Sequence, residues 1–313
     1  MAASKDLARR FLHVNLNCQS LDATEALYGK QLGLAARMRG NPEAAGKGEV
    51  LGFDGDTFTR TSFLYDARGG RNACSLELIE WGSPELKPDH NTDPARPGIR
   101  SALFTLNDLT ETIAGLQGAG YAVSEPITGL ISGTRSVLTT DPDGIVVELT
   151  EVPSEHPGAL FAGIRISAVD ATATVKFLSA IGFEVVQEPT AAPLFGGQLT
   201  PGGRAEQIPC IVARLALPED QLQFTVTVIQ HPDARKHPLP EGGTTQGLYR
   251  CAMRVENIEK AMSLLPNFVE VQRDPIWCPM PGTPLEGLYV SFLCSPDGVV
   301  FEFVERPFKH FVR

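Results

Sequence analysis

Hydrophobic and polar residues alternate in four stretches of this chain, and each stretch precedes a segment of helical periodicity. The first stretch is Phe11–Asn17, FLHVNLN, in which apolar residues recur at every second position. Such alternation predicts a β-strand with one buried face. Residues 21–32 then have apolar positions at helical spacing, and Gly33 follows, a residue that commonly ends helices. We therefore expect a strand, a helix and β-rich sequence up to residues 75–81, SLELIEW.

The same order of elements occurs three more times along the chain. The later openings, helix ends and closing strands are 99–106, 109–120 and 141–148 in the second copy, 161–167, 181–183 and 224–230 in the third, and 248–255 and 295–302 in the fourth. Positions 13 and 77 recur 150 residues later, at 163 and 227. A repeat at this spacing indicates that a module has been duplicated.

Three segments rich in Pro and polar residues separate these modules. They are 81–97, 152–158 and 231–243. Pro-Asp-Gly, which occurs before the last strand of the second and fourth modules, favours a tight turn. We interpret residues 152–158 as the connection between two domains, and the other two segments as connections within a domain.

Four βαβββ modules with Leu-Gly-Leu or Ile-Gly-Phe helix ends and Pro-Asp-Gly-x-x-x-Glu closings resemble the vicinal oxygen chelate superfamily. That superfamily includes glyoxalase I, methylmalonyl-CoA epimerase, extradiol dioxygenases, and the fosfomycin and bleomycin resistance proteins. The resemblance extends from about Phe11 to Glu305. It implies an α+β fold in which the modules pair into two tandem glyoxalase-like domains with cupped mixed sheets. We expect these domains at residues 8–152 and 159–308.

Composition narrows the classes of function that remain. The 313 residues suffice for two cores, and the net charge of -10 argues against a nucleic-acid partner. No apolar run is long enough to cross a bilayer, and residues 1–10 lack the apolar stretch of a signal peptide. The six cysteines are scattered without a CxxC pair, so we expect a cytoplasmic protein with no membrane partner.

The resemblance also implies a metal site in the first half of the chain. Glyoxalase-like members have ligands in the order His or Gln, Glu, His, Glu, and the matching residues here are His13, Glu77, Ser101 and Glu148. Two carboxylates that face one cleft repel each other unless a cation lies between them. One imidazole and two carboxylates suit Mn, Fe, Co, Ni or Zn. We therefore predict a divalent metal on His13, Glu77 and Glu148, with Ser101 in place of a fourth ligand.

The matching positions in the second half are Gly163, Thr227, Arg250 and Glu302. Only one of them is a metal ligand of the usual kind, and Arg250 would repel a cation. We expect the second domain to bind no metal and to support or cover the first. An alternative is that it holds an anionic ligand through Arg250.

Strand alternation predicts which other side chains face the first cleft. The expected substrate-binding residues are Asn15, Asn17, Ser101, Leu103 and Thr105. Together they form a mixed polar and apolar pocket, which suits a small organic molecule.

Two functions fit this pocket. One is a metal-dependent lyase, isomerase or epimerase in which Glu148 or Glu77 acts as general base. The other is a metal-free binding or resistance protein of the bleomycin-resistance type. An extradiol dioxygenase is less favoured, because Glu77 stands where that subgroup lacks a carboxylate and Ser101 where it needs His. Either function is compatible with a monomer or a homodimer.

Overall fold

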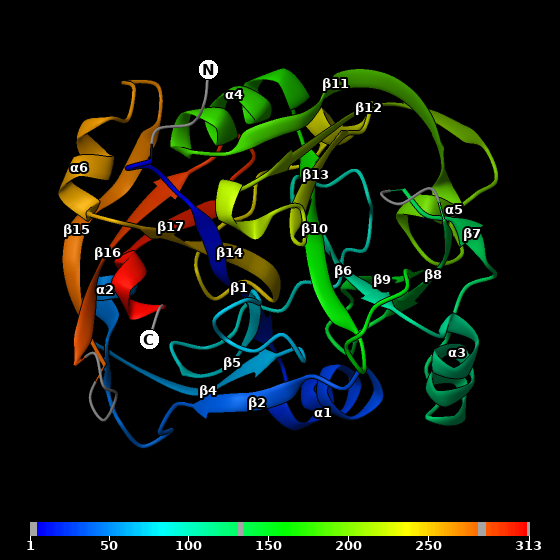
Figure 1. The fold of residues 1–313 in the computed structure, drawn as a ribbon, viewed down its shortest axis with the longest axis horizontal. Coiled ribbons are helices and arrows are strands. Elements are labelled where there is room, and N and C mark those ends of the chain that lie inside the picture. The colour runs from blue at the N-terminus through cyan, green and yellow to red at the C-terminus, as the bar shows by residue number, and fades with distance from the viewer. Residues whose placement is uncertain (1–4, 131–133, 281–285, 312–313) are drawn as a thin grey trace.

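The computed structural model describes residues 5–130, 134–280 and 286–311, and it consists mainly of β-strands (Figure 1). The first module contains β1 (Arg10–Cys18), α1 (Leu21–Glu25), the π-helix η1 (Ala26–Gln31), β2 (Ala35–Arg39), β3 (Gly46–Lys47), α2 (Gly48–Leu51), β4 (Asp56–Tyr65) and β5 (Ser75–Ser83). The second contains β6 (Gly98–Leu106), α3 (Leu109–Gly118), β7 (Ile127–Thr128), β8 (Arg135–Thr140) and β9 (Val146–Glu151).

The second half repeats this order. The third module contains β10 (Leu160–Ala168), α4 (Ala171–Ile181), β11 (Glu184–Phe195), α5 (Gly196–Leu199), β12 (Gln207–Ala216), the 3-10 helix η2 (Pro218–Asp220) and β13 (Thr225–Gln230). After the short η3 (Ala234–Lys236), the fourth contains β14 (Gly247–Val255), α6 (Ile258–Ser263), β15 (Glu270–Pro279), β16 (Gly287–Cys294) and β17 (Val300–Glu305), followed by η4 (Phe308–His310). The predicted α+β class with repeated βαβββ modules is confirmed.

The strands form two mixed sheets, and each sheet combines one module from either half of the chain. The 9-stranded sheet, called sheet A below, has the order β15-β16-β17-β14-β1-β5-β4-β2, with β3 attached to β4. The 8-stranded sheet, called sheet D below, has the order β11-β12-β13-β10-β6-β9-β8-β7. Module one therefore shares a sheet with module four, and module two shares a sheet with module three.

This crossed pairing differs from the pairing that we expected within residues 8–152 and 159–308. The first strand of every module has the same alternating pattern, so the pattern does not specify which two first strands pair. In the structure β1 pairs antiparallel with β14, and β10 pairs antiparallel with β6. Residues 152–158 thus connect two modules of one sheet, whereas the other two linkers cross between the sheets.

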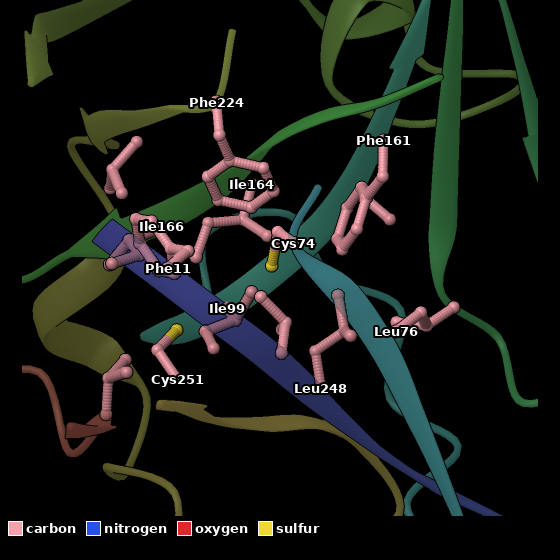
Figure 2. Close-up of a cluster of buried hydrophobic side chains, with 14 of the residues drawn as sticks. Phe11, Cys74, Leu76, Ile99, Phe161, Ile164, Ile166, Phe224, Leu248 and Cys251 are labelled. Carbon is pink, nitrogen blue, oxygen red and sulfur yellow. The ribbon is translucent and has the colours of Figure 1, made fainter. Parts of the chain in front are cut away.

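The main core lies between the two sheets. Phe11 of β1 contacts Phe183 and Phe224, with ring centroids 5.6 and 4.4 Å apart. Figure 2 shows side chains from both sheets gathered there, including Leu76, Ile99, Ile164 and Leu248. Because successive strand residues point to opposite faces, the residues between these apolar positions face away from the shared core. Each sheet therefore presents a second face on which polar side chains collect.

Local signals in the sequence account for the helices. Asp170 and Asp108 accept hydrogen bonds from the backbone N–H groups at the starts of α4 and α3. The first helix ends before Gly33, as predicted, and that glycine has a φ of 84°. Its last turns are a π-helix rather than a regular α-helix. No helix among the described residues is long and apolar enough to span a membrane.

Candidate functional site

Four ionisable side chains meet on the outer face of sheet A. His13, Glu77, Arg250 and Glu302 lie on β1, β5, β14 and β17, which are neighbours in the sheet. The pairing register places Asn15 between Glu77 on one side and Arg250 on the other. Module one and module four each supply two of the four side chains.

The distances within this cluster are those of ion pairs. His13 Nε2 lies 3.2 Å from Glu77 Oε2 and 3.8 Å from Glu302 Oε2. Arg250 Nε lies 3.1 Å from Glu302 Oε2, and its Nη2 lies 3.5 Å from Glu77 Oε2. The guanidinium of Arg250 therefore interacts with both carboxylates at once.

Charge neutralisation in this cluster outweighs the effect of burial. Burial alone would raise the pKa of Glu302, but the charge of Arg250 and the neighbouring His13 hold that pKa below its ordinary value. Burial would likewise lower the pKa of Arg250, and the carboxylates of Glu302 and Glu77 raise it above its usual value instead. The lowered pKa of Glu302 and the raised pKa of Arg250 both mean that these two groups are charged at neutral pH.

A cavity of about 110 Å³ adjoins the cluster. Aromatic side chains form much of its wall: Phe53 and Trp81 are in an edge-to-face contact at 5.5 Å, and Tyr249 and Phe292 also line the cavity. Asn15, only 2% exposed, also lines the cavity, and its Nδ2 has no hydrogen-bond partner among the described residues. An unpaired buried donor beside a cavity indicates that a ligand or water is expected there.

Asn17 holds the rim of this cavity. Its Nδ2 donates to the backbone oxygens of Gly243 and Thr245, and its Oδ1 accepts a hydrogen bond from Trp81 Nε1. All the polar atoms of this side chain are thus used within the protein. Asn17 therefore orients the indole of Trp81 and holds the backbone of residues 243–245, which precede β14, against β1.

The remaining predicted site residues lie on sheet D. Ser101, Leu103 and Thr105 are in β6, and Glu148 is in β9 opposite Leu103. The structure therefore brings His13 and Glu77 together but places Glu148 on the other sheet. The predicted trio would have formed if modules one and two had paired; the crossed pairing puts Glu302 beside His13 and Glu77 instead.

Glu148 has a different electrostatic environment from Glu77. It is 2% exposed, and burial raises its pKa to about 7, opposed by the charge of Arg165 and a backbone hydrogen bond from Leu130. Burial also lowers the pKa of Arg165 to about 10. Glu148 is thus a buried carboxylate whose pKa lies well above its ordinary value.

These residues do not fit a resident divalent metal ion. In sheet A, a cation would have to share Glu77 and Glu302 with Arg250, whose positive charge repels it. In sheet D, Glu148 faces Arg165 rather than a second carboxylate. Across residues 5–130, 134–280 and 286–311, no three His, Cys, Asp or Glu side chains form a group that could hold a metal ion.

Arg250 and Glu302 occupy ligand positions of the repeat, but the sequence pattern predicts them in a separate domain from His13 and Glu77. His13 and Arg250 hold equivalent positions in the first strands of modules one and four, and Glu77 and Glu302 hold equivalent positions in their last strands. The repeat therefore already related these four residues to one another. The sequence pattern did not show that modules one and four pair in one sheet.

Comparison with known proteins agrees with this architecture. Residues 10–149 match the model of the Glyoxalase/Bleomycin resistance protein/Dioxygenase superfamily. Glyoxalase I from Zea mays superposes with a TM-score of 0.67 at 15% identity, over 95% of this chain and 92% of that one. A putative dioxygenase from Bacillus subtilis superposes with a TM-score of 0.61 at 14% identity, over 97% and 88% of the two chains. No curated protein sequence matches the chain.

The match over residues 10–149 agrees with the resemblance that the repeated modules indicated. The match to the superfamily model lies in the first half of the chain, and the similarity of fold extends over nearly its whole length.

Proposed function

We propose that the protein binds a small organic molecule in the cleft of sheet A without a metal ion. The observation that carries this proposal is the position of Arg250, which pairs with both Glu77 and Glu302. In this interpretation the guanidinium neutralises the two carboxylates and also offers donors to a ligand. Such a protein corresponds to the metal-free binding or resistance type, which is one of the two functions compatible with the sequence.

The walls of the cleft indicate the kind of ligand. Phe53, Trp81, Tyr249 and Phe292 present ring surfaces, which favour a flat or aromatic molecule. Asn15 Nδ2 and Arg250 Nε are buried donors without a hydrogen-bond partner among the described residues, and both residues line the cavity, which favours an oxygen-bearing group on the ligand. The ligand that fits best is therefore a small aromatic or planar compound with a carbonyl, carboxylate or sulfonate oxygen.

An anionic aromatic dye, 8-anilinonaphthalene-1-sulfonate, provides a direct test. The protein is treated with EDTA and titrated with the dye, and energy transfer from tryptophan is recorded. We expect saturable binding near one equivalent, weakened at least tenfold in Arg250→Gln and in Asn15→Leu. The chain has two tryptophans, so Trp277→Phe, on strand β15, is a matched control that should keep the transfer from Trp81. Binding that disappears with EDTA treatment, or that ignores Arg250→Gln, contradicts the proposal.

A second candidate function is a metal-dependent lyase, isomerase or epimerase. It is favoured by one observation, which is that His13 Nε2 lies within 3.8 Å of carboxylate oxygens from both Glu77 and Glu302. A metal at this position requires Arg250 to leave the two carboxylates. The set for this candidate is then His13, Glu77 and Glu302, because Glu148 belongs to the other sheet. Metal content distinguishes the two candidates.

We further propose that a single chain suffices for binding and that it works in the cytoplasm. Both modules that form each cleft belong to one chain, so a second copy is not needed to complete the site. All six cysteines are free thiols, which suits a reducing compartment. Sedimentation velocity would test the first statement, with a monomer expected, and cell fractionation would test the second.

A further inference from the structure

The outer face of sheet D holds a second cavity, of about 270 Å³, which the proposed function does not use. Two arginines line it, Arg165 on β10 and Arg100 on β6, together with Val146 of β9 and Leu199 of α5. Arg165 is only 3% exposed. Buried guanidinium groups are unusual, so their partners determine what this cavity can hold.

The partners of both arginines are backbone carbonyls. Arg165 donates to the oxygens of Gln198 and Leu199, at 3.3 and 2.6 Å, and Arg100 donates from Nε to the oxygens of Arg96 and Pro97, at 3.0 and 3.1 Å. Neither forms an ion pair with a carboxylate in the part of the chain that the structure describes. These bonds fix the side chains. The carboxylates of Glu148 and Asp89 act electrostatically on Arg165 and Arg100, respectively, but neither lies within ion-pair distance of that arginine.

The two arginines also repel each other. Burial lowers the pKa of Arg100 to about 10, and the charges of Arg96 and Arg165 lower it as well. Like charges that lie close together in a poorly hydrated site raise the free energy of the folded protein unless an anion joins them.

Acidic residues around this cavity already have partners. Asp89 pairs with Arg96 at 2.7 Å, and Asp93 lies 3.3 Å from His237 Nε2. Asp143 accepts hydrogen bonds from the backbone of Gln19 and from Gln246, at 2.8 and 3.0 Å. Asp141, the fourth lining acid, accepts from the hydroxyl of Tyr28 at 2.9 Å. These carboxylates are therefore held by residues other than Arg100 and Arg165, although the charge of Asp89 partly offsets the lowering of the Arg100 pKa.

Equivalent positions of the internal repeat show that Arg100 and Arg165 of sheet D have no arginine counterparts in sheet A. Arg165 occupies the position of Asn15, since Arg165 faces Ser101 across the strands as Asn15 faces Arg250. Arg100 occupies the position of Tyr249, because each is the extra residue at a register shift in the same strand of its module. Equivalent positions thus carry Asn and Tyr in sheet A but two arginines in sheet D. The two clefts therefore differ in the charge of these equivalent side chains.

We propose that the cleft of sheet D binds a small oxyanion, such as a carboxylate or phosphate group, between Arg100 and Arg165. The remaining guanidinium hydrogens supply charge-assisted bonds, and Gln19 and Gln246 line the same cavity as neutral polar groups. This site is separate from the metal-free cleft of sheet A and does not depend on what that cleft binds.

Isothermal titration of the full chain with inorganic phosphate, and separately with acetate, tests the proposal. We expect saturable binding of one equivalent for at least one of these anions, weakened at least tenfold in Arg100→Gln and in Arg165→Gln. The better anion then shows whether a phosphate or a carboxylate is the preferred group. Arg60→Gln, which removes an exposed arginine that pairs with Asp22 and Glu80, is the control for net charge and should bind as the wild type does.

Arg165 also fixes the carbonyls of α5, so its substitution could unfold the protein. Arg100→Gln leaves those bonds in place and keeps the test valid. Absence of saturable binding of both anions, or equal affinity in Arg100→Gln and wild type, overturns the proposal. A loss in Arg250→Gln alone would place the anion in sheet A and would also overturn it. None of these results bears on dye binding by the EDTA-treated protein, so the two proposals can fail independently.

Discussion

Replacing Arg250 by histidine should convert the cluster of sheet A into a metal site. The substitution removes the guanidinium that lies 3.1 Å from Glu302 and 3.5 Å from Glu77. It also supplies an imidazole at the one position where this cluster lacks a ligand of the glyoxalase-like kind. His13, Glu77, Glu302 and the new side chain would then offer four ligands around one point.

The expected energies follow from burial. Removing one partner of a buried ion pair costs about 3–5 kcal/mol, because the remaining charge is left without compensation. Here two carboxylates lose their partner, so the metal-free Arg250→His variant should be less stable than the wild type by about that amount near pH 8. The pKa of Glu302, which Arg250 holds low, should rise in the variant. The loss of stability should therefore shrink as the pH falls and the carboxyl group gains a proton.

Urea unfolding with and without Zn²⁺ or Mn²⁺ measures both effects. A metal at one hundred times its Kd stabilises the folded state by about 2.7 kcal/mol. We expect this gain in Arg250→His and no gain in the wild type. Arg250→Lys is the matched control, since it keeps the positive charge and should remain indifferent to metal. Equal stabilisation of wild type and Arg250→His would refute the reasoning.

Three further predictions concern stability. Burial raises the pKa of Asp220 to about 7, above its unfolded value, so the stability that its protonated form contributes is lost as the pH rises through about 7. Asp220→Asn should therefore become more stable than the wild type above pH 7, by at most about 4 kcal/mol, and equal to it near pH 4, as urea unfolding at several pH values would show. Asn17→Leu should cost about 2–4 kcal/mol and shift the emission of Trp81, because three hydrogen bonds are lost; unchanged emission in a Trp277→Phe background would count against that role. Phe11→Ala should cost about 3–5 kcal/mol in a thermal or urea melt, since its ring packs between the two sheets, and a loss below 1 kcal/mol would be inconsistent with this packing.

Local features of the fold were predictable from the sequence because they depend on neighbouring residues. The alternation of Phe11–Asn17 specified β1, and Gly33 marked the end of the first helical segment. The 150-residue repeat related His13 to Gly163 and Glu77 to Thr227, and these pairs do hold equivalent places in β1, β10, β5 and β13.

The composition of the site was not predictable in the same way. Which first strands pair depends on long-range contacts and on the course of the linkers, and every first strand has a compatible pattern. The assignment of Glu148 to the same cleft as His13 and Glu77 depended on that choice. With β1 beside β14, Glu302 takes that place and Arg250 enters the cluster. The aromatic walls also depend on pairing, since Trp81 and Phe292 come from modules far apart in the sequence.

The metal content of the purified protein tests the central claim most directly. The wild type would be produced in medium supplemented with Mn, Fe, Co, Ni and Zn, passed over a desalting column, and analysed by inductively coupled plasma mass spectrometry beside His13→Ala. The account predicts far less than one equivalent of any of these metals in the wild type, and no change in His13→Ala. One equivalent in the wild type that is absent from His13→Ala would contradict it, and would make the metal-dependent enzyme the better description of this cleft.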